Sequence, residues 1–282
     1  MPRGEAWSEQ EVALTVADYI DMLLKELRGE AYSKTEHRQS LISKLSGRSG
    51  AAIERKHENI SAVLIELGMP AIDGYKPLSN YQRILKDHVS KWLAAHPGAI
   101  GGLEAIADRE PDRAPLPGDL DGVFVAPPER EHGEMIREYS SEGRISLPGD
   151  LGRREARNRT LGLRGEEFVV ELERSRLLMA GREDLSGAVE WVSRERGDGL
   201  GFDVRSYDLD EREKLIEVKT TNYGKRFSFF VTDNEVRTSE ERAEQYSLYR
   251  LFNFSNRPSI YCLKGSIREH FSLEPKSYLA RR

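Results

Sequence analysis

The sequence predicts an all-α N-terminal domain over residues 1–96 and an α/β C-terminal domain over residues 159–282, with a mixed sheet flanked by helices. Capped amphipathic helices fill the first region, and short apolar segments alternate with helical ones in the last. Glycine, proline and charged residues crowd 97–158 between them, which is typical of a linker. At 282 residues the chain is long enough for two separate cores.

Four helices are expected in the N-terminal domain, and each follows a serine that can cap its first turn. These caps are Ser8 with Glu11, Ser33 with Glu36, Ser49 alone, and Ser79 with Gln82. The helices should end near Gly29, Gly47, Gly68 and Pro97, in that order. In the first helix, apolar residues recur at helical spacing from Val12 to Leu27, which predicts a buried face. Short turns between such helices favour a helix-turn-helix or Myb-like bundle.

Basic residues concentrate in this domain between Ser33 and His57, where six lysines and arginines stand against two glutamates. Lysine, arginine and helix N-termini contact phosphates, and a helix in the major groove reads bases. We therefore expect contact with double-stranded DNA, with His57 and Asn59 adding polar base readout. The full expected set is Lys34, Arg38, Arg48, Arg55, Lys56, His57 and Asn59. A protein-binding surface and a solvated helix face without a partner are the two open alternatives.

The C-terminal domain is expected to begin with a long helix over residues 160–179. Its expected core residues are Phe168, Val169, Leu172 and Leu177. The elements expected next are a short helix over 184–193, strands at 203, 215–218 and 226–232, a helix over 238–252 and a last strand over 258–263 that buries Cys262. Tyr246, Tyr249 and Arg250 fall on the second long helix, where a core position is favoured over contact with phosphates. A small element is also expected within the linker, at 120–125.

The residues that most suggest chemistry lie on two neighbouring predicted strands. Asp203 ends one strand, and Glu217 and Lys219 follow on an apolar strand whose alternation points both to one face. A turn between the strands would bring Asp203 beside Glu217. Two neighbouring carboxylates and the Val218 carbonyl form a hard oxygen site that suits Mg²⁺. Such an ion activates water and neutralises phosphate charge, and Lys219 could orient that water or meet the developing charge.

An ordinary surface pair is the alternative interpretation of Glu217 and Lys219. Cross-strand and same-face pairs of glutamate and lysine are common on exposed strands. The strand 215–218 is apolar enough to be central in a sheet, however, and an ordinary solvent-exposed pair is less expected on such a strand.

Several motifs in this region occur together in one known family. They are Gly165-Glu166 with Val169, Trp191-Val-Ser193, Gly197-Asp-Gly-Leu-Gly-Phe-Asp203, Ile216-Glu-Val-Lys-Thr-Thr221 and Asn234-Glu235. In this order they resemble the NO VEIN C-terminal family, which is grouped with the restriction-endonuclease-like PD-(D/E)XK nucleases, over residues 160–265. The predicted order αβββαβ agrees with the core of such domains. One departure is that Phe202 stands where the superfamily motif has proline.

The resemblance implies a Mg²⁺-dependent DNA endonuclease of restriction or defence type, in which Mn²⁺ can substitute and base modification can affect cleavage. It implies that Glu166 joins Asp203, Glu217 and Lys219 in the catalytic set, with Glu167 as the less favoured register. Glu235 is expected to support the site or to cap a helix. Because one site cuts one strand, a double-strand break calls for a homodimer. Segments within 48–82 also resemble helical regions placed before nuclease domains in bacterial restriction-type proteins.

Two other functions stay open, a non-catalytic DNA-binding module and an interaction scaffold in a defence or repair complex. The net charge of −5 argues against a uniformly basic protein that coats nucleic acid. With Cys262 as its single cysteine, the chain cannot form an intrachain disulfide, and a zinc site is disfavoured. Neither a membrane-length apolar run nor a hydrophobic leader is expected, which favours the cytoplasm.

Overall fold

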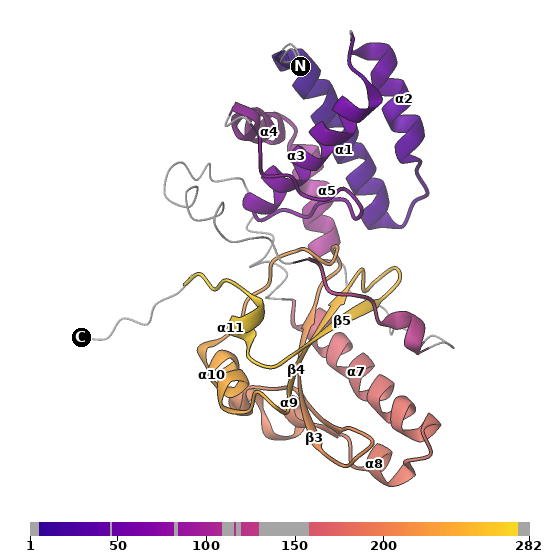
Figure 1. Cartoon of the computed structure of the whole chain (residues 1–282), viewed down its shortest axis with the longest axis vertical. Helices are drawn as coiled ribbons and strands as arrows, with labels where there is room; N and C mark the ends of the chain where they lie inside the picture. The colour runs from indigo at the N-terminus through magenta and orange to yellow at the C-terminus, as the bar shows by residue number, and fades with distance from the viewer. Residues whose placement is uncertain are drawn as a thin grey trace, which may run out of the picture.

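The computed structural model describes residues 6–45, 47–81, 84–108, 116, 120–129 and 158–275. A bundle of N-terminal helices lies against an α/β domain built from the C-terminal part of the chain (Figure 1). This arrangement confirms the predicted fold class, a helical domain together with a mixed sheet flanked by helices. Most of the predicted linker lies outside the described residues.

Serine caps begin three of the N-terminal helices at the predicted positions. These helices are α1 (Glu9–Arg28), α2 (Lys34–Lys44) and α3 (Gly50–Glu66), and α4 (Ile84–Ala95) follows them. The hydroxyl of Ser8 accepts the amide of Glu11, and the Glu11 carboxylate accepts the amide of Ser8, so this capping box is complete. Helix α4 starts later than its expected cap at Ser79, and Gln82 lies outside the described residues.

A further helix, α5 (Pro97–Ala107), occupies the start of the predicted linker. Proline at the first helical position already has the φ that a helix needs, and the amide it lacks would have no helical partner there. Pro97 therefore starts a helix where a linker was expected. Ile100, Leu103 and Ile106 bury their side chains in the bundle core, so the helical domain extends beyond residue 96.

The C-terminal domain contains a five-stranded sheet in the order β1-β2-β3-β4-β5. Its strands are β1 (Glu190–Trp191), β2 (Val204–Tyr207), β3 (Glu213–Thr220), β4 (Tyr246–Phe252) and β5 (Ser259–Lys264). Strands β3 and β4 pair in parallel and all other neighbours pair antiparallel. The small element expected at 120–125 is a 3₁₀ turn, η1 (Asp121–Val123), and a bridge from Phe124 to Ile260.

Helix α7 (Arg159–Met179) covers one face of this sheet, as Figure 1 shows. The other elements are α8 (Glu183–Gly187), α9 (Val192–Arg196), η2 (Asp198–Leu200), α10 (Asp233–Glu241) and α11 (Ile267–His270). Ile216 and Val218 of β3 pack with the buried residues of α7, whereas Leu215 packs with Val236 of α10. The predicted alternation of β3 is therefore present. None of the helices within the described ranges has the length and hydropathy to cross a membrane.

The elements that follow β3 differ from the predicted order αβββαβ. Residues 226–232 form no strand, and a capping box of Thr232 and Glu235 starts α10 before the expected cap at Thr238. Residues 246–252 then form β4, not a helix. Every side chain of β4 is buried, and periodicity cannot distinguish such a run from a buried helix.

Two smaller predictions also change. The helix expected over 184–193 is divided among α8, β1 and the start of α9. Tyr246 and Tyr249 are core residues, as favoured, but they lie on a strand, and Arg250 beside them is buried as well. Cys262 lies on β5 as expected and is half-buried.

The two domains share a core at the loop that follows β3. Tyr223 and Phe227 of this loop pack among the buried residues of the helical bundle. The Tyr223 hydroxyl donates to the carbonyl oxygen of Leu103 at 2.8 Å, and Asn222 Nδ2 donates to that of Ile106 at 3.2 Å. The end of the central strand is therefore anchored in the helical domain.

Helix α7 approaches β3 closely at Gly165. A methyl group added there would lie 1.8 Å from Thr220 Oγ1 and 2.9 Å from Thr220 Cβ. Glycine thus allows the helix backbone to lie directly against the central strand.

Replacing Gly165 with alanine should lower the free energy of unfolding by about 1–3 kcal/mol, because overpacking forces helix and strand apart. The matched control is Gly162→Ala on the same helix, where no other described part of the protein lies within 4 Å of the added methyl group. That substitution should stabilise the protein by about 1 kcal/mol through helix propensity. Urea denaturation measures both, and equal effects would contradict the close approach.

Candidate active site

The register of β2 and β3 sets Asp203 beside Glu217. Val204 pairs with Ile216, and the amide of Asp203 donates to the Ile216 carbonyl oxygen at 2.9 Å. The expected turn is present between the two strands, with Glu211 at a φ of 71°. Asp203 precedes β2, whereas the sequence placed it at the end of a strand. The two acids nevertheless come together because β2 and β3 form a hairpin.

Asp203 is held by the backbone of β3. Its Oδ2 accepts the amide of Val218 at 2.8 Å. Burial, followed by the nearby charge of Glu166, raises the pKa of Asp203 to about 7. This carboxylate is therefore fixed in position but costly to ionise without a cation nearby.

Glu217 lies in the middle of the sheet and is 3% exposed. Burial, followed by the charge of Asp203, raises the pKa of Glu217 well above its ordinary value. The pKa values of both carboxyl groups are therefore raised, and the charge of Asp203 contributes to the shift of Glu217.

Lys219 joins two carboxylates from different elements. Its Nζ lies 2.7 Å from Oε1 of Glu217 and 2.8 Å from Oε2 of Glu235. Burial opposes the ammonium charge, but the two carboxylates raise the pKa of Lys219 above its ordinary value. Lys219 is therefore a fixed cation.

Glu235 has both of the roles that the sequence left open. It is the third residue of α10, where its carboxylate accepts the amide of Thr232 at 3.1 Å and completes a capping box. The same Oε2 contacts Lys219. The helix cap therefore sets the position of the lysine.

Glu166 reaches the site from α7. Its Oε2 accepts the indole Nε1–H of Trp191 at 2.7 Å and the hydroxyl of Ser193. Glu167 instead pairs with Arg164 at 2.8 Å, so the geometry favours the Glu166 register. The roles of Trp191 and Ser193 were missed, because neither has a spacing that predicts contact with a helix 25 residues or more away.

The donor set suits a hard divalent cation. Asp203 and Glu217 present oxygen atoms at one place, and a cation would relieve their repulsion and hold both ionised. Across the ranges that the structure describes, no three His, Cys, Asp or Glu side chains form a metal-binding cluster. The Val218 carbonyl therefore stays the predicted third protein ligand, with water at the other positions, as Mg²⁺ commonly has.

The opposite face of the sheet carries a buried polar cluster that the sequence reasoning missed. Glu173 of α7 contacts Lys214 at 2.8 Å, Arg176 at 2.8 Å, the Ser206 hydroxyl at 2.6 Å and the Tyr249 hydroxyl at 2.9 Å. Burial opposes its charge, but Lys214 and Arg176 hold the pKa of Glu173 below its usual value. This cluster fastens α7 to three strands. Glu173 follows Val169 by one helical turn, which is the sequence signal for its inward direction.

The prediction of base readout by His57 and Asn59 is wrong. His57 is fully buried, with Nδ1 3.2 Å from the Tyr75 hydroxyl and Nε2 3.6 Å from Oδ2 of Asp18. Asn59 is 7% exposed and donates to the Leu78 carbonyl oxygen at 2.7 Å. Both side chains face the protein interior, so neither is presented to a DNA groove.

The helical spacing of α3 explains the burial of His57. It follows Ile53 by four residues and precedes Ile60 by three, and both isoleucines are fully buried. Burial lowers the pKa of His57 to about 4, so the ring is neutral at physiological pH.

The predicted cationic contacts differ in their accessibility. Arg55 is exposed, and Arg38 pairs with Glu54 at 3.1 Å across α2 and α3. Arg48 is held by Glu11 at 2.7 Å, and Lys56 lies over the Trp7 ring. Lys34 donates to the carbonyl oxygen of Asp73. Arg55 and Arg38 are therefore the most accessible of the predicted phosphate contacts.

Asp203 should make the metal-free protein less stable as pH rises. Its pKa is about 7 when folded and 3.8 ordinarily, so the folded state binds the extra proton between these values and loses stability as pH rises through them. In EDTA, the melting temperature should fall from pH 5 to pH 8, and Asp203→Asn should reduce that fall. The control is Asp184→Asn, because Arg182 lowers the pKa of Asp184 to about 2, outside this range. An unchanged fall in Asp203→Asn would refute the raised pKa of Asp203.

Comparison with known proteins finds one similarity. Residues 165–263 match the model of a family described as Protein NO VEIN, C-terminal. The matched range contains the whole candidate site, from Glu166 to Glu235. Searches of curated proteins and of solved structures each found no match. The region 165–263 of this chain is therefore similar to the NO VEIN C-terminal family, as its motifs predicted.

Proposed function

We propose that this protein is a metal-dependent DNA endonuclease whose active site contains Asp203, Glu217, Lys219 and Glu166. The observation that carries the proposal is a pair of carboxylates, buried Glu217 and part-buried Asp203, beside a fixed lysine. Burial and the charge of Asp203 make Glu217 costly to ionise, and Lys219, the cation beside it, also pairs with Glu235. A divalent cation would supply the missing positive charge.

Mg²⁺ is the expected ion and Mn²⁺ a substitute, and either would activate a water molecule and neutralise charge on the phosphate when bound. Asp203, Glu217 and the Val218 carbonyl would hold it. Lys219 is placed to meet negative charge that develops on the scissile phosphate, since two carboxylates fix its ammonium group. Glu166 is held by Trp191 and completes the acidic set from α7.

The helical domain would hold double-stranded DNA through phosphate contacts. Exposed Arg55 and the neighbouring Arg38 support this role better than the buried residues of α3. Cleavage of both strands would need two copies of the chain, because each copy contributes one site. A restriction or defence role in the cytoplasm, with response to base modification, belongs to the same proposal.

A non-catalytic DNA-binding module is the second candidate. It is favoured by the pairing of Lys219 with two carboxylates, which balance the positive charge of the lysine. In this case the same fold would only recognise DNA.

Nicking of supercoiled plasmid in Mg²⁺ or Mn²⁺ tests the proposal. Asp203→Asn, Glu217→Gln and Lys219→Met should each lower the nicking rate at least about 100-fold, because each removes a group that acts on the reacting phosphate or water. Glu241→Gln is the control, since this exposed acid lies on α10 without contacting the site. Circular dichroism confirms that each variant is folded.

The second candidate predicts a different result in the same assay. DNA binding in EDTA without nicking by the parent, on plain and modified substrates, would support the non-catalytic module. Undiminished nicking by all three site variants would exclude the assigned active site.

Arg55→Gln should weaken binding to a duplex and lower the slope of log affinity against log salt by about 1, because one phosphate contact is lost. Lys91→Gln on α4 is a matched control, since Lys91 is also exposed but lies outside the predicted contact set. Fluorescence anisotropy in EDTA over a salt series measures both. Equal slopes for the two variants would remove Arg55 from the interface.

A further inference from the structure

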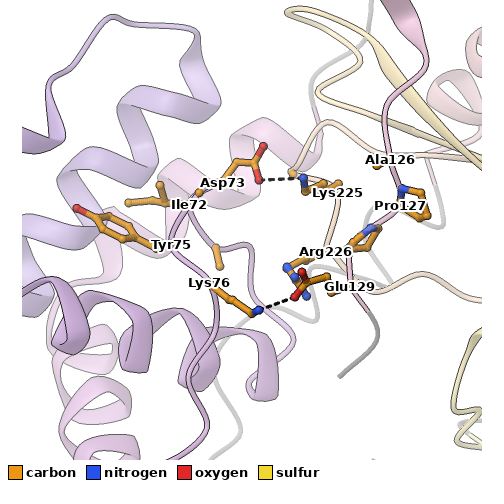
Figure 2. Close-up of a pocket in the computed structure, with 13 residues that line it drawn as sticks. Ile72, Asp73, Tyr75, Lys76, Ala126, Pro127, Glu129, Lys225 and Arg226 are labelled. Carbon is orange, nitrogen blue, oxygen red and sulfur yellow. Dashed lines mark hydrogen bonds and ion pairs between the residues drawn. The ribbon is translucent and has the colours of Figure 1, made fainter. Parts of the chain in front are cut away.

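A pocket of about 290 Å³ lies between the two domains. Residues 71–76 of the helical domain form one wall, and residues 126–129 and 224–226 form the others. Figure 2 shows Lys76, Lys225 and Arg226 extending into the space between these segments. Neither the DNA-contacting set nor the candidate active site includes these three cations.

The charges around the pocket form weak pairs that bridge its walls. Lys225 Nζ lies 3.7 Å from Oδ1 of Asp73, and Lys76 contacts Glu129 (Figure 2). Lys76, followed by a smaller effect of Arg226, lowers the pKa of Glu129. The side chains of Lys76 and Glu129 are 67% and 75% exposed, so this ion pair contributes little to stability. Another anion can therefore replace Glu129 beside Lys76.

A fourth cation supports the same wall from behind. Lys34 donates to the Asp73 carbonyl oxygen and lies over the Tyr75 ring, 4.6 Å from its centroid. The lining of the pocket places three cations, Lys76, Lys225 and Arg226, against two acids, Asp73 and Glu129. Lys34 lies behind this wall together with the carboxylate of Glu26, which accepts the Asp73 amide, so the described surroundings carry one net positive charge. This excess of positive charge favours an anionic ligand.

The pocket has a defined position relative to the candidate active site. Lys225 follows Lys219 by six residues, and six residues span at most about 22 Å. Tyr223 and Asn222 anchor the intervening loop in the helical domain. A duplex rises about 3.4 Å per base pair, so the two lysines lie at most on the order of six base pairs apart.

We propose that this pocket binds a backbone phosphate of DNA, within one helical turn of the phosphate held at the active site. The inference rests on the proposed DNA-directed function and adds a contact between the domains. The phosphate displaces Glu129 from Lys76 and Asp73 from Lys225, because it carries a full charge, the first pair is exposed and the second is 3.7 Å long. Bound DNA then joins the helical domain to the catalytic strand.

Two substitutions in one ion pair test this contact with opposite signs. Lys225→Gln removes a cation and should weaken duplex binding and lower the salt slope by about 1. Asp73→Asn breaks the same pair but removes an acid, so it should strengthen binding. A purely structural role of the Lys225–Asp73 pair predicts the same direction for both variants. Lys76→Gln and Glu129→Gln form a second test of this kind. The first variant should weaken duplex binding and the second should strengthen it.

Binding is measured by anisotropy with a 5′-labelled duplex in EDTA, so that it does not depend on cleavage. Changes of the same sign within each pair, or unchanged salt slopes in both lysine variants, would overturn the phosphate site. Competition by inorganic phosphate or a mononucleotide as strong as competition by duplex would also overturn it, since the ligand would then be a free anion.

Nicking by the parent protein tests the nuclease proposal separately. Nicking that depends on Asp203 while the lysine variants bind normally would preserve the nuclease and reject the pocket. Opposite effects of Lys225→Gln and Asp73→Asn without any nicking would support the pocket as a contact of a non-catalytic module.

Discussion

The placement of two carboxylates side by side, Glu217 on β3 and Asp203 just before β2, is the constraint on which the C-terminal domain depends. Asp203 and Glu217 must lie close together because the β2–β3 register places them there. Their repulsion is only partly offset, since Lys219 is shared between Glu217 and Glu235. Such an arrangement stores unfavourable electrostatic energy that a divalent cation would release. Elements far apart in sequence, α7 with Glu166 and α10 with Glu235, converge on this one place.

Strand β3 also connects the two domains. Gly165 lets α7 lie against it, and the loop after it places Tyr223 and Phe227 in the helical core. A displacement of the helical domain would therefore act directly on the strand that carries Glu217 and Lys219. The pocket beside Lys225 lies at this same junction. Under the proposed function, DNA contact at the junction and catalysis on the strand would be coupled through this packing.

Much of the fold was predictable where the signals are local. Serine caps located the starts of α1, α2 and α3, and alternation identified β3 and its two faces. Other elements had conflicting local signals. Pro97, which was expected to belong to a linker, starts α5. The run that forms β4 is buried on both sides, so it lacks the alternation that identifies a strand. The candidate triad of Asp203, Glu217 and Lys219 was visible as a spacing, but the supporting contacts of Trp191 and Ser193 were not.

The sequence by itself determined the helix caps, the inward and outward faces of β3, and the presence of two acids and a lysine on neighbouring strands. These features depend on residues a few positions apart, which interact through backbone geometry alone. The tertiary structure decided that β4 is a strand beside β3, that His57 is buried, that Glu166 turns toward Asp203, and that Glu235 both caps α10 and holds Lys219. Each of these depends on partners distant in the chain, and burial among such partners outweighs local propensity.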